Sequence, residues 1–276
     1  MDKTQTYLME SPDEATRLDV KTDPEKVKEQ AIWCGIGPGK RVLDVGCGSG
    51  KVSSVLHEMV QPDGYVLGID FSQDRIAYAR QRFGSSKGLD FQLVNLTGPL
   101  DIIGEFDFIW ARFVLEYFRA DAVTLIENLA GCLNSDGIAC LIDLDHNCLG
   151  HYPLPNNMED ILCRLMKRMS EDHNFDPFVG RKLYTYLYDL QFRDIQVNMT
   201  PHHLIYGDLN SSDHFNWMKK IEMAGNKAVD VFDDYPGGYR GFHDDFEAFF
   251  MDPRRFTYTP LIMCKGKKPV YIGSCS

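Results

Sequence analysis

An apolar run that ends in closely spaced glycines is the feature that most constrains the fold of this chain. Residues 42–54 read VLDVGCGSGKVSS, with glycines at alternate positions 46, 48 and 50. The apolar residues are typical of a buried strand, and the segment from Lys51 has the pattern of a helix. Glycine permits positive φ and lets bare backbone approach a ligand closely. The stretch therefore predicts a strand, a tight turn and a helix, with a ligand held against the turn.

Strand and helix patterns alternate through the first half of the chain. Strands are expected at 41–45, 65–70, 90–95, 106–111 and 138–145, and helices at 23–34, 51–60, 72–83 and 121–133. The strands are apolar on both faces, which is typical of a parallel sheet covered by helices on both sides. The pattern predicts an α/β protein with a doubly wound open sheet over residues 23–145.

After residue 145 this rhythm changes. A strongly amphipathic helix is expected over 157–173, because its methionines, leucines and isoleucine share one face. A short helix near 180–190, a strand near 194–199, a mostly helical and loop-like stretch over 200–253 and a last strand near 257–265 should follow. Pro260 is awkward inside a central strand, so a start after this proline is an alternative for the last strand.

Composition excludes several classes of partner. The chain has 29 basic and 40 acidic residues, a formal charge of −11, and an acidic surface repels nucleic acid. It has no apolar run of 18 residues and no signal-peptide core at the printed N-terminus, so neither a membrane partner nor export is expected. The eight cysteines form no C-x-x-C motif, which favours free thiols in the cytoplasm. No metal is expected, because the adjacent His202 and His203 point apart in an extended chain.

Three nucleotide-binding templates can be compared with the glycine turn. The phosphate-binding loop fails, because Val45 stands where its first glycine belongs and Val52 where its hydroxyl residue belongs. The dinucleotide fingerprint fails at one residue, because Lys51 replaces the third glycine that allows tight helix–strand packing. The third template is D-x-G-x-G-x-G, which the sequence matches from Asp44 to Gly50.

This third template resembles the S-adenosylmethionine site of class I methyltransferases. The segments FDFIWARFVLEYF (106–118) and LNSDGIACLIDLD (133–145) are also similar to that family, most of all to its small-molecule, quinone-biosynthesis-like branch. The resemblance implies one methyltransferase domain over 1–276, with a seven-stranded sheet of order 3-2-1-4-5-7-6 and one antiparallel strand. Helical insertions at 146–193, after strand five, and at 200–253, between strands six and seven, would then form a substrate cover.

The cofactor is expected to contact residues at the carboxyl ends of the first strands. Asp70 ends the second strand, where a carboxylate can accept both ribose hydroxyls, and Phe71 beside it can stack on adenine. In the family an aspartate usually ends strand three; here Asn95 would accept the adenine amino group and Leu96 would offer its backbone amide. The remaining expected contacts are Asp44, Gly46, Cys47, Gly48 and Gly50 in the turn, with Arg17 and Arg112 outside it.

Methyl transfer is an in-line displacement, so much of the catalysis can come from positioning alone. His146 follows strand five and is the first candidate for a general base, because its intrinsic pKa suits neutral pH. Glu116 and Tyr7 are further candidates. Arg112 could instead form a salt bridge with Glu116, one turn on.

The sequence predicts transfer of a methyl group from S-adenosylmethionine to a small molecule. The motif for flipped-base amino groups is absent, and one glutamate in VLEYF is too few for protein arginine methylation. An NAD(P)-dependent oxidoreductase and a non-catalytic S-adenosylmethionine-binding protein are the alternatives. The acceptor, the atom that is methylated and the oligomeric state stay open. Asp70→Ala is expected to weaken cofactor binding about tenfold or more while the fold survives.

Overall fold

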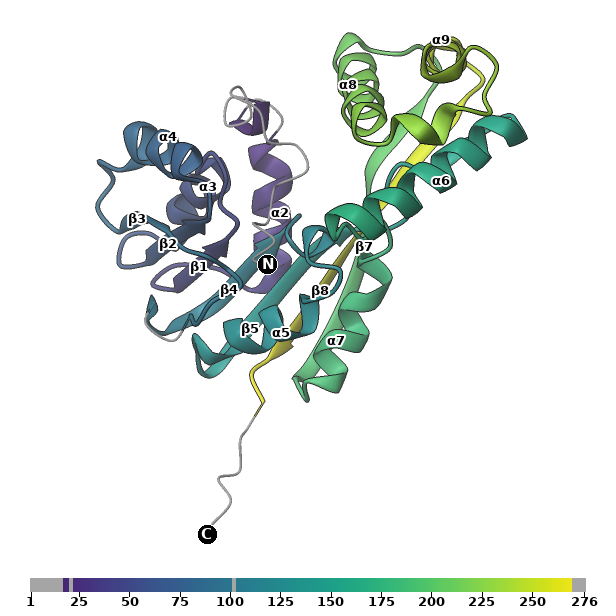
Figure 1. Cartoon of the computed structure of the whole chain (residues 1–276). Helices are drawn as coiled ribbons and strands as arrows, with labels where there is room; N and C mark the ends of the chain where they lie inside the picture. The colour runs from purple at the N-terminus through teal and green to yellow at the C-terminus, as the bar shows by residue number, and fades with distance from the viewer. Residues whose placement is uncertain (1–16, 20–21, 101–102, 270–276) are drawn as a thin grey trace.

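The computed structural model describes residues 17–19, 22–100 and 103–269, which form one mixed sheet with helices on both faces (Figure 1). The strands are β1 (Arg41–Val45), β2 (Tyr65–Asp70), β3 (Leu89–Leu93), β4 (Phe106–Arg112), β5 (Leu133–Leu144), β6 (His151–Tyr152), β7 (Arg193–Tyr206) and β8 (Phe256–Lys267). The path β3-β2-β1-β4-β5-β8 runs through the sheet, and both β6 and β7 pair with β8.

This order confirms the predicted sheet. Strands β1 to β5 pair in parallel, whereas β8 is antiparallel to both β5 and β7. Counted without the two-residue β6, the order is 3-2-1-4-5-7-6. The predicted sheet lacked β6, which is too short to leave an alternating pattern.

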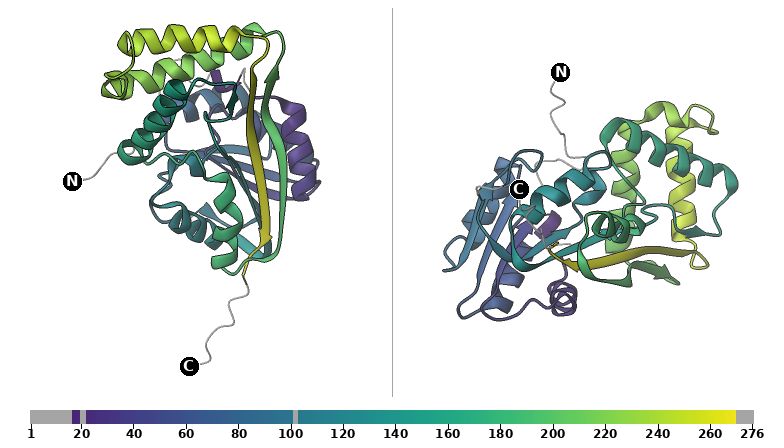
Figure 2. Two further views of the ribbon diagram at one scale, coloured as in Figure 1. Left: turned by 90° about the vertical axis from the view of Figure 1, so that its right-hand side faces the viewer. Right: turned by 90° about the horizontal axis from the view of Figure 1, so that it is seen from below.

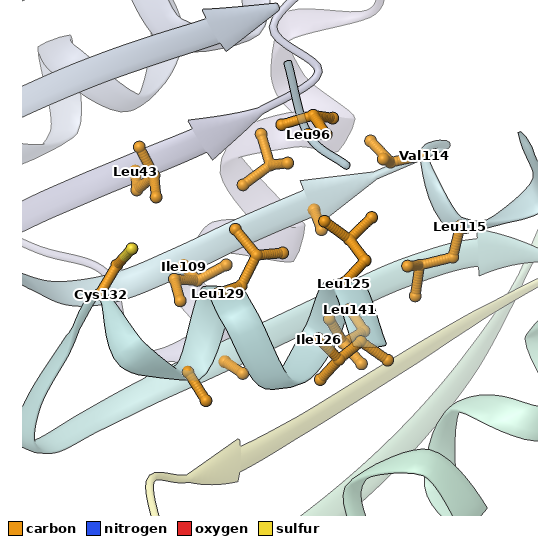
Figure 3. Packing of buried hydrophobic residues seen from close by; sticks show 14 of the residues in the cluster. Leu43, Leu96, Ile109, Val114, Leu115, Leu125, Ile126, Leu129, Cys132 and Leu141 are labelled. Carbon is orange, nitrogen blue, oxygen red and sulfur yellow. The ribbon is translucent and has the colours of Figure 1, made fainter. Parts of the chain in front are cut away.

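Helices cover the parallel part of the sheet on both sides. One core lies under α2 (Pro24–Cys34), α3 (Lys51–Val60) and α4 (Gln73–Phe83), and the other under α5 (Ala122–Gly131) and α7 (Leu183–Asp189). Figure 3 shows α5 laid against the strands, with Leu129 beside Ile109 and Leu125 beside Leu141. The apolar runs of the central strands are therefore buried from both faces, as a doubly wound sheet requires.

The second half of the chain was less predictable. Strand β7 continues to Tyr206, so the predicted helical stretch from residue 200 is wrong at its start; its helices are α8 (Ser211–Lys227) and α9 (Gly238–Met251). A start of the last strand after Pro260 is also wrong, because β8 begins at Phe256. Pro260 lies opposite Pro201 of β7, at a register shift, and its carbonyl accepts from the Asp145 amide. Proline has no backbone N–H to donate. Because the two prolines face each other at an irregular position, the regular hydrogen bonds between β7 and β8 do not lack a donor there.

Long strands carry a second helical layer beyond the sheet core. Figure 2 shows β7 and β8 running side by side up to α8 and α9. There α6 (Asn156–His173) packs with α8, α9 and the 3-10 helix η4 (Val229–Phe232) around a separate apolar cluster. The predicted methionine and leucine face of α6 is buried in this cluster. Among the described residues, no helix is long and apolar enough to cross a membrane.

Candidate cofactor and acceptor site

A cavity of about 240 Å³ lies at the carboxyl edge of the sheet. Its walls come from the glycine turn after β1, the segments that follow β2 and β4, and helices α6 and α8. Open α/β sheets bind ligands outside the carboxyl ends of their strands, where the strand order reverses. The cavity thus joins the two halves of the chain at the position where a ligand is expected.

The glycine turn forms one wall of this cavity. Gly46, Cys47 and Gly48 line it, and both glycines have positive φ, 66° and 54°. A Cβ atom on Gly46 would lie 2.7 Å from a methyl group of Val114, so a side chain would strain both the backbone and the packing. Gly50 serves the fold instead, because it caps the N-terminus of α3 in the left-handed conformation.

Asp70 lies at the end of β2, lines the cavity and is buried. Its Oδ2 accepts from the Gly48 amide at 3.0 Å, and its Oδ1 accepts from the Ser72 amide at 2.9 Å. The Arg75 guanidinium donates to the same Oδ1 through Nε at 3.2 Å and Nη2 at 3.1 Å. The carboxylate is therefore held rigidly beside the glycine turn, as a ribose ligand would require, and it also neutralises a buried cation.

Arg75 is a site residue that the sequence analysis missed. It sits in the first turn of α4, lines the cavity, and its guanidinium lies 5.0 Å from the centre of the Phe71 ring. Phe71 also lines the cavity, so the ring predicted to meet adenine has a cation beside it. One feature of the sequence could have identified Arg75 as a site residue: it follows Asp70 by five residues, across the start of a predicted helix.

Asp44 lies behind the turn rather than on the cavity wall. Ser53 Oγ donates to its Oδ2 at 2.6 Å, and burial raises the pKa of Asp44 to about 7. The nearby Arg112 does line the cavity; burial lowers its pKa to about 10, while Asp44 opposes that change. Arg112 Nε donates to Gln30 Oε1 at 2.9 Å. Together these residues form a polar support beneath the turn.

Glu116 lines the cavity from the short helix η2 (Leu115–Tyr117) that follows β4. Asn147 Nδ2 donates to Glu116 Oε2 at 2.9 Å. The Glu116 amide donates to Asp143 Oδ2 at 3.2 Å, and burial together with the Glu116 charge raises the pKa of Asp143 well above its usual value. Sequence analysis missed Asp143 and Asn147. The predicted salt bridge between Arg112 and Glu116 is not among the described ion pairs.

The far part of the cavity is apolar. Five side chains from η2, the residue after it, α6 and the segment after α6 form this wall: Tyr117, Phe118, Met166, Met169 and Phe175. Three basic side chains also reach it: His173, His202 and Lys220. An organic molecule larger than a metal ion or a water cluster fits these surroundings.

Several predicted site residues do not meet at the cavity. His146 is absent from the described lining, and its ring instead lies near Phe178 and Tyr258, at centroid distances of 5.9 and 6.4 Å. Burial lowers the pKa of His146. Asn95 is exposed two residues beyond β3, and its Oδ1 accepts from the Thr97 amide and hydroxyl.

Other predictions are placed on the cavity or lie outside the described residues. Leu96 and Arg17 line the cavity. Tyr7 lies outside the residues that the structure describes. Where the chain is described, no group of three or more His, Cys, Asp or Glu side chains is arranged to hold a metal ion.

The sheet order is that of a class I, Rossmann-like α/β fold, and the glycine turn and the acid at the end of β2 lie on one cavity at the carboxyl edge of its sheet. Residues 43–139 match the family described as "Methyltransferase domain". The matched residues run from β1 into β5 and cover about a third of the chain, so this part of the chain is similar to a methyltransferase domain.

Individual relatives support the family and cover only part of the chain. Juvenile hormone acid O-methyltransferase from Bombyx mori is 29% identical over 112 residues, which are 39% of each chain. The match thus spans well under half the length of that relative. Among solved structures, BH2331 from Bacillus halodurans has a TM-score of 0.58 at 14% identity, covering 89% of this chain and 99% of that one. Phosphoethanolamine N-methyltransferase 2 from Haemonchus contortus, solved with S-adenosylhomocysteine, has a TM-score of 0.53 at 15% identity, covering 89% and 53%.

Proposed function

We propose that this protein transfers the methyl group of S-adenosylmethionine to a small organic molecule. The observation that supports this proposal most is that one cavity is lined both by the glycine turn with the buried Asp70 carboxylate and by a group of apolar side chains. The first part suits a nucleoside with ribose hydroxyls, and the second suits an apolar acceptor placed in line with it. The Haemonchus relative supports the same cofactor, because it was solved with S-adenosylhomocysteine.

In this proposal Asp70 accepts the ribose hydroxyls and Phe71 stacks on adenine. The backbone of Gly46 and Gly48 passes beside the amino-acid part of the cofactor, with Arg17 near its carboxylate. The bound cofactor supplies an electrophilic methyl group on a sulfonium. The protein contributes rigid placement, and Glu116, whose carboxylate lines the cavity, is the proposed proton acceptor.

The helical segments of the second half act as the substrate cover. Support comes from Asn147, Cys148, Met166 and Met169 of the first insertion, which line the cavity, and from Lys220 of the second. Closing such a chamber excludes water from the reacting centre. Residues 1–276 then work as one methyltransferase domain, because each half supplies part of the cavity wall.

The location and the partner classes belong to the same proposal. A cytoplasmic location is favoured because all seven cysteines in the described part of the chain are free thiols. The formal charge of −11 disfavours nucleic acid as acceptor. The nicotinamide alternative has less support, since Lys51 stands at the third fingerprint position, where tight packing requires glycine.

The test is turnover of methyl-labelled S-adenosylmethionine with pools of small acids, alcohols, phenols, amines and activated carbons. The proposal expects one pool to yield labelled product and an equal amount of S-adenosylhomocysteine. Firm cofactor binding without S-adenosylhomocysteine formation in any pool would contradict methyl transfer and favour the non-catalytic alternative.

A further inference from the structure

The charges around the cavity differ in sign from those of the chain as a whole. The described wall carries four permanently charged basic groups and two carboxylates, although the chain has a formal charge of −11. The basic groups are Arg17, Arg75, Arg112 and Lys220, and the acids are Asp70 and Glu116. S-adenosylmethionine itself carries a sulfonium, an ammonium and one carboxylate. Because the basic groups of the wall outnumber its carboxylates, the cavity favours an acceptor that carries a negative charge.

Two of the basic groups already have buried acidic neighbours. Arg75 forms an ion pair with Asp70, with 3.1 Å between nitrogen and oxygen. Arg112 lies beside Asp44 and bonds to Gln30. These arginines support the glycine turn and the end of β2, so they are committed to the cofactor half of the site.

Lys220 differs from them in its surroundings. It projects from α8 and is half-buried, and its ammonium lies 4.6 Å from the centre of the buried Trp217 ring. Among the described ion pairs none includes Lys220, whereas its neighbour Lys219 pairs with Glu222 at 2.8 Å. An ammonium held between an aromatic face and an apolar cavity gains from an anionic partner, because the cavity wall offers it little solvation.

The position of Lys220 separates it from the reacting centre. It comes from the cover layer, while the glycine turn and Glu116 belong to the sheet side of the cavity; Figure 1 shows α8 and β1 in opposite parts of the molecule. The apolar side chains of Met166, Met169 and Phe175 line the same cavity. An elongated acceptor can therefore place an apolar body in the middle and an anionic group at the cover.

We propose that Lys220 binds the carboxylate of the acceptor, so that the substrate is an apolar organic acid. The inference rests on the proposed function, because it concerns the acceptor half of the same cavity. It assigns α8 a recognition role: the Trp217 ring fixes the ammonium, and the ammonium selects the charge of the substrate.

The test uses the full chain saturated with S-adenosylhomocysteine and three ten-carbon probes below their micelle concentrations. Decanoate, decan-1-ol and decyltrimethylammonium share an apolar chain and differ in charge. Calorimetry should show decanoate binding about tenfold or more tighter than decan-1-ol, since a charge-assisted hydrogen bond is added. Decyltrimethylammonium should bind weakest.

Variants of neighbouring lysines make the test specific. Lys220→Met should abolish the preference for decanoate over decan-1-ol, Lys220→Arg should keep most of it, and Lys219→Met should leave it unchanged. Equal binding of acid and alcohol by the parent protein, or an undiminished preference in Lys220→Met, would overturn the assignment. Binding of S-adenosylhomocysteine is measured on the parent protein and on every variant. If the parent protein does not bind S-adenosylhomocysteine, the proposed function is refuted. If it binds S-adenosylhomocysteine but does not prefer decanoate over decan-1-ol, only the role of Lys220 is refuted.

Discussion

Removal of the Asp70 carboxylate should damage the fold as well as the cofactor site. Asp70 and Arg75 are each 4% exposed, and the Asp70 carboxylate also accepts from the Gly48 and Ser72 amides. Asp70→Ala leaves the guanidinium buried without its partner, and breaking a buried pair from one side costs about 3–5 kcal/mol. The sequence-based expectation was that the fold survives because Asp70 ends a strand; the buried pair adds a large loss of stability to that expectation.

A double variant separates the pair from its individual residues. Asp70→Ala combined with Arg75→Met removes both charges, so it should be less destabilised than Asp70→Ala alone. Urea denaturation followed by circular dichroism gives the free energy of unfolding of the parent, both single variants and the double variant. If Asp70→Ala unfolds within about 0.5 kcal/mol of the parent, or if the double variant loses the full sum of the single effects, the buried-pair argument fails.

Three further predictions concern the turn, its support and the acceptor end. Gly46→Ala should lose about 1–2 kcal/mol of stability, because φ is 66° and a Cβ would lie 2.7 Å from a valine methyl, whereas Gly37→Ala, with open space around it, should unfold like the parent. Asp44 has a folded-state pKa of about 7 against an ordinary 3.8, so stability should fall as the pH rises from about 4 to about 7, by about 4 kcal/mol at most, and denaturation of Asp44→Asn across this range should lack that slope. With an acceptor found by the turnover screen, His146→Ala should keep kcat within about threefold of the parent while Glu116→Gln lowers it about tenfold or more; the reverse result would return the catalytic role to the histidine.

The sheet could be predicted because its signals are local and repeated. Buried parallel strands are apolar throughout, and the helices before and between them carry clear caps, such as Asp23 before α2 and Ser72 before α4. The length of β7 and the place of Pro260 in β8 were not predictable in this way. Both depend on pairing between strands about 60 residues apart, where one proline faces another.

The candidate site could be predicted only where a motif fixes the backbone. The glycine turn and Asp70 lie on the cavity because they follow directly from β1 and β2. His146 follows β5 just as closely, yet its positive φ of 53° and its contacts with Phe178 and Tyr258 hold it away from the described wall. Asn147 and Lys220 come from segments whose orientation depends on tertiary packing, and no local pattern marks them, whereas the only local signal for Arg75 is its spacing from Asp70.

Calorimetric titration of the full chain with S-adenosylhomocysteine, NAD and NADP tests the central claim most directly. A turn built for a nucleoside without phosphates, with Lys51 in place of the third fingerprint glycine, predicts one site for S-adenosylhomocysteine and no measurable heat from either dinucleotide. Firm binding of NAD or NADP, with no response to S-adenosylhomocysteine, would contradict the account.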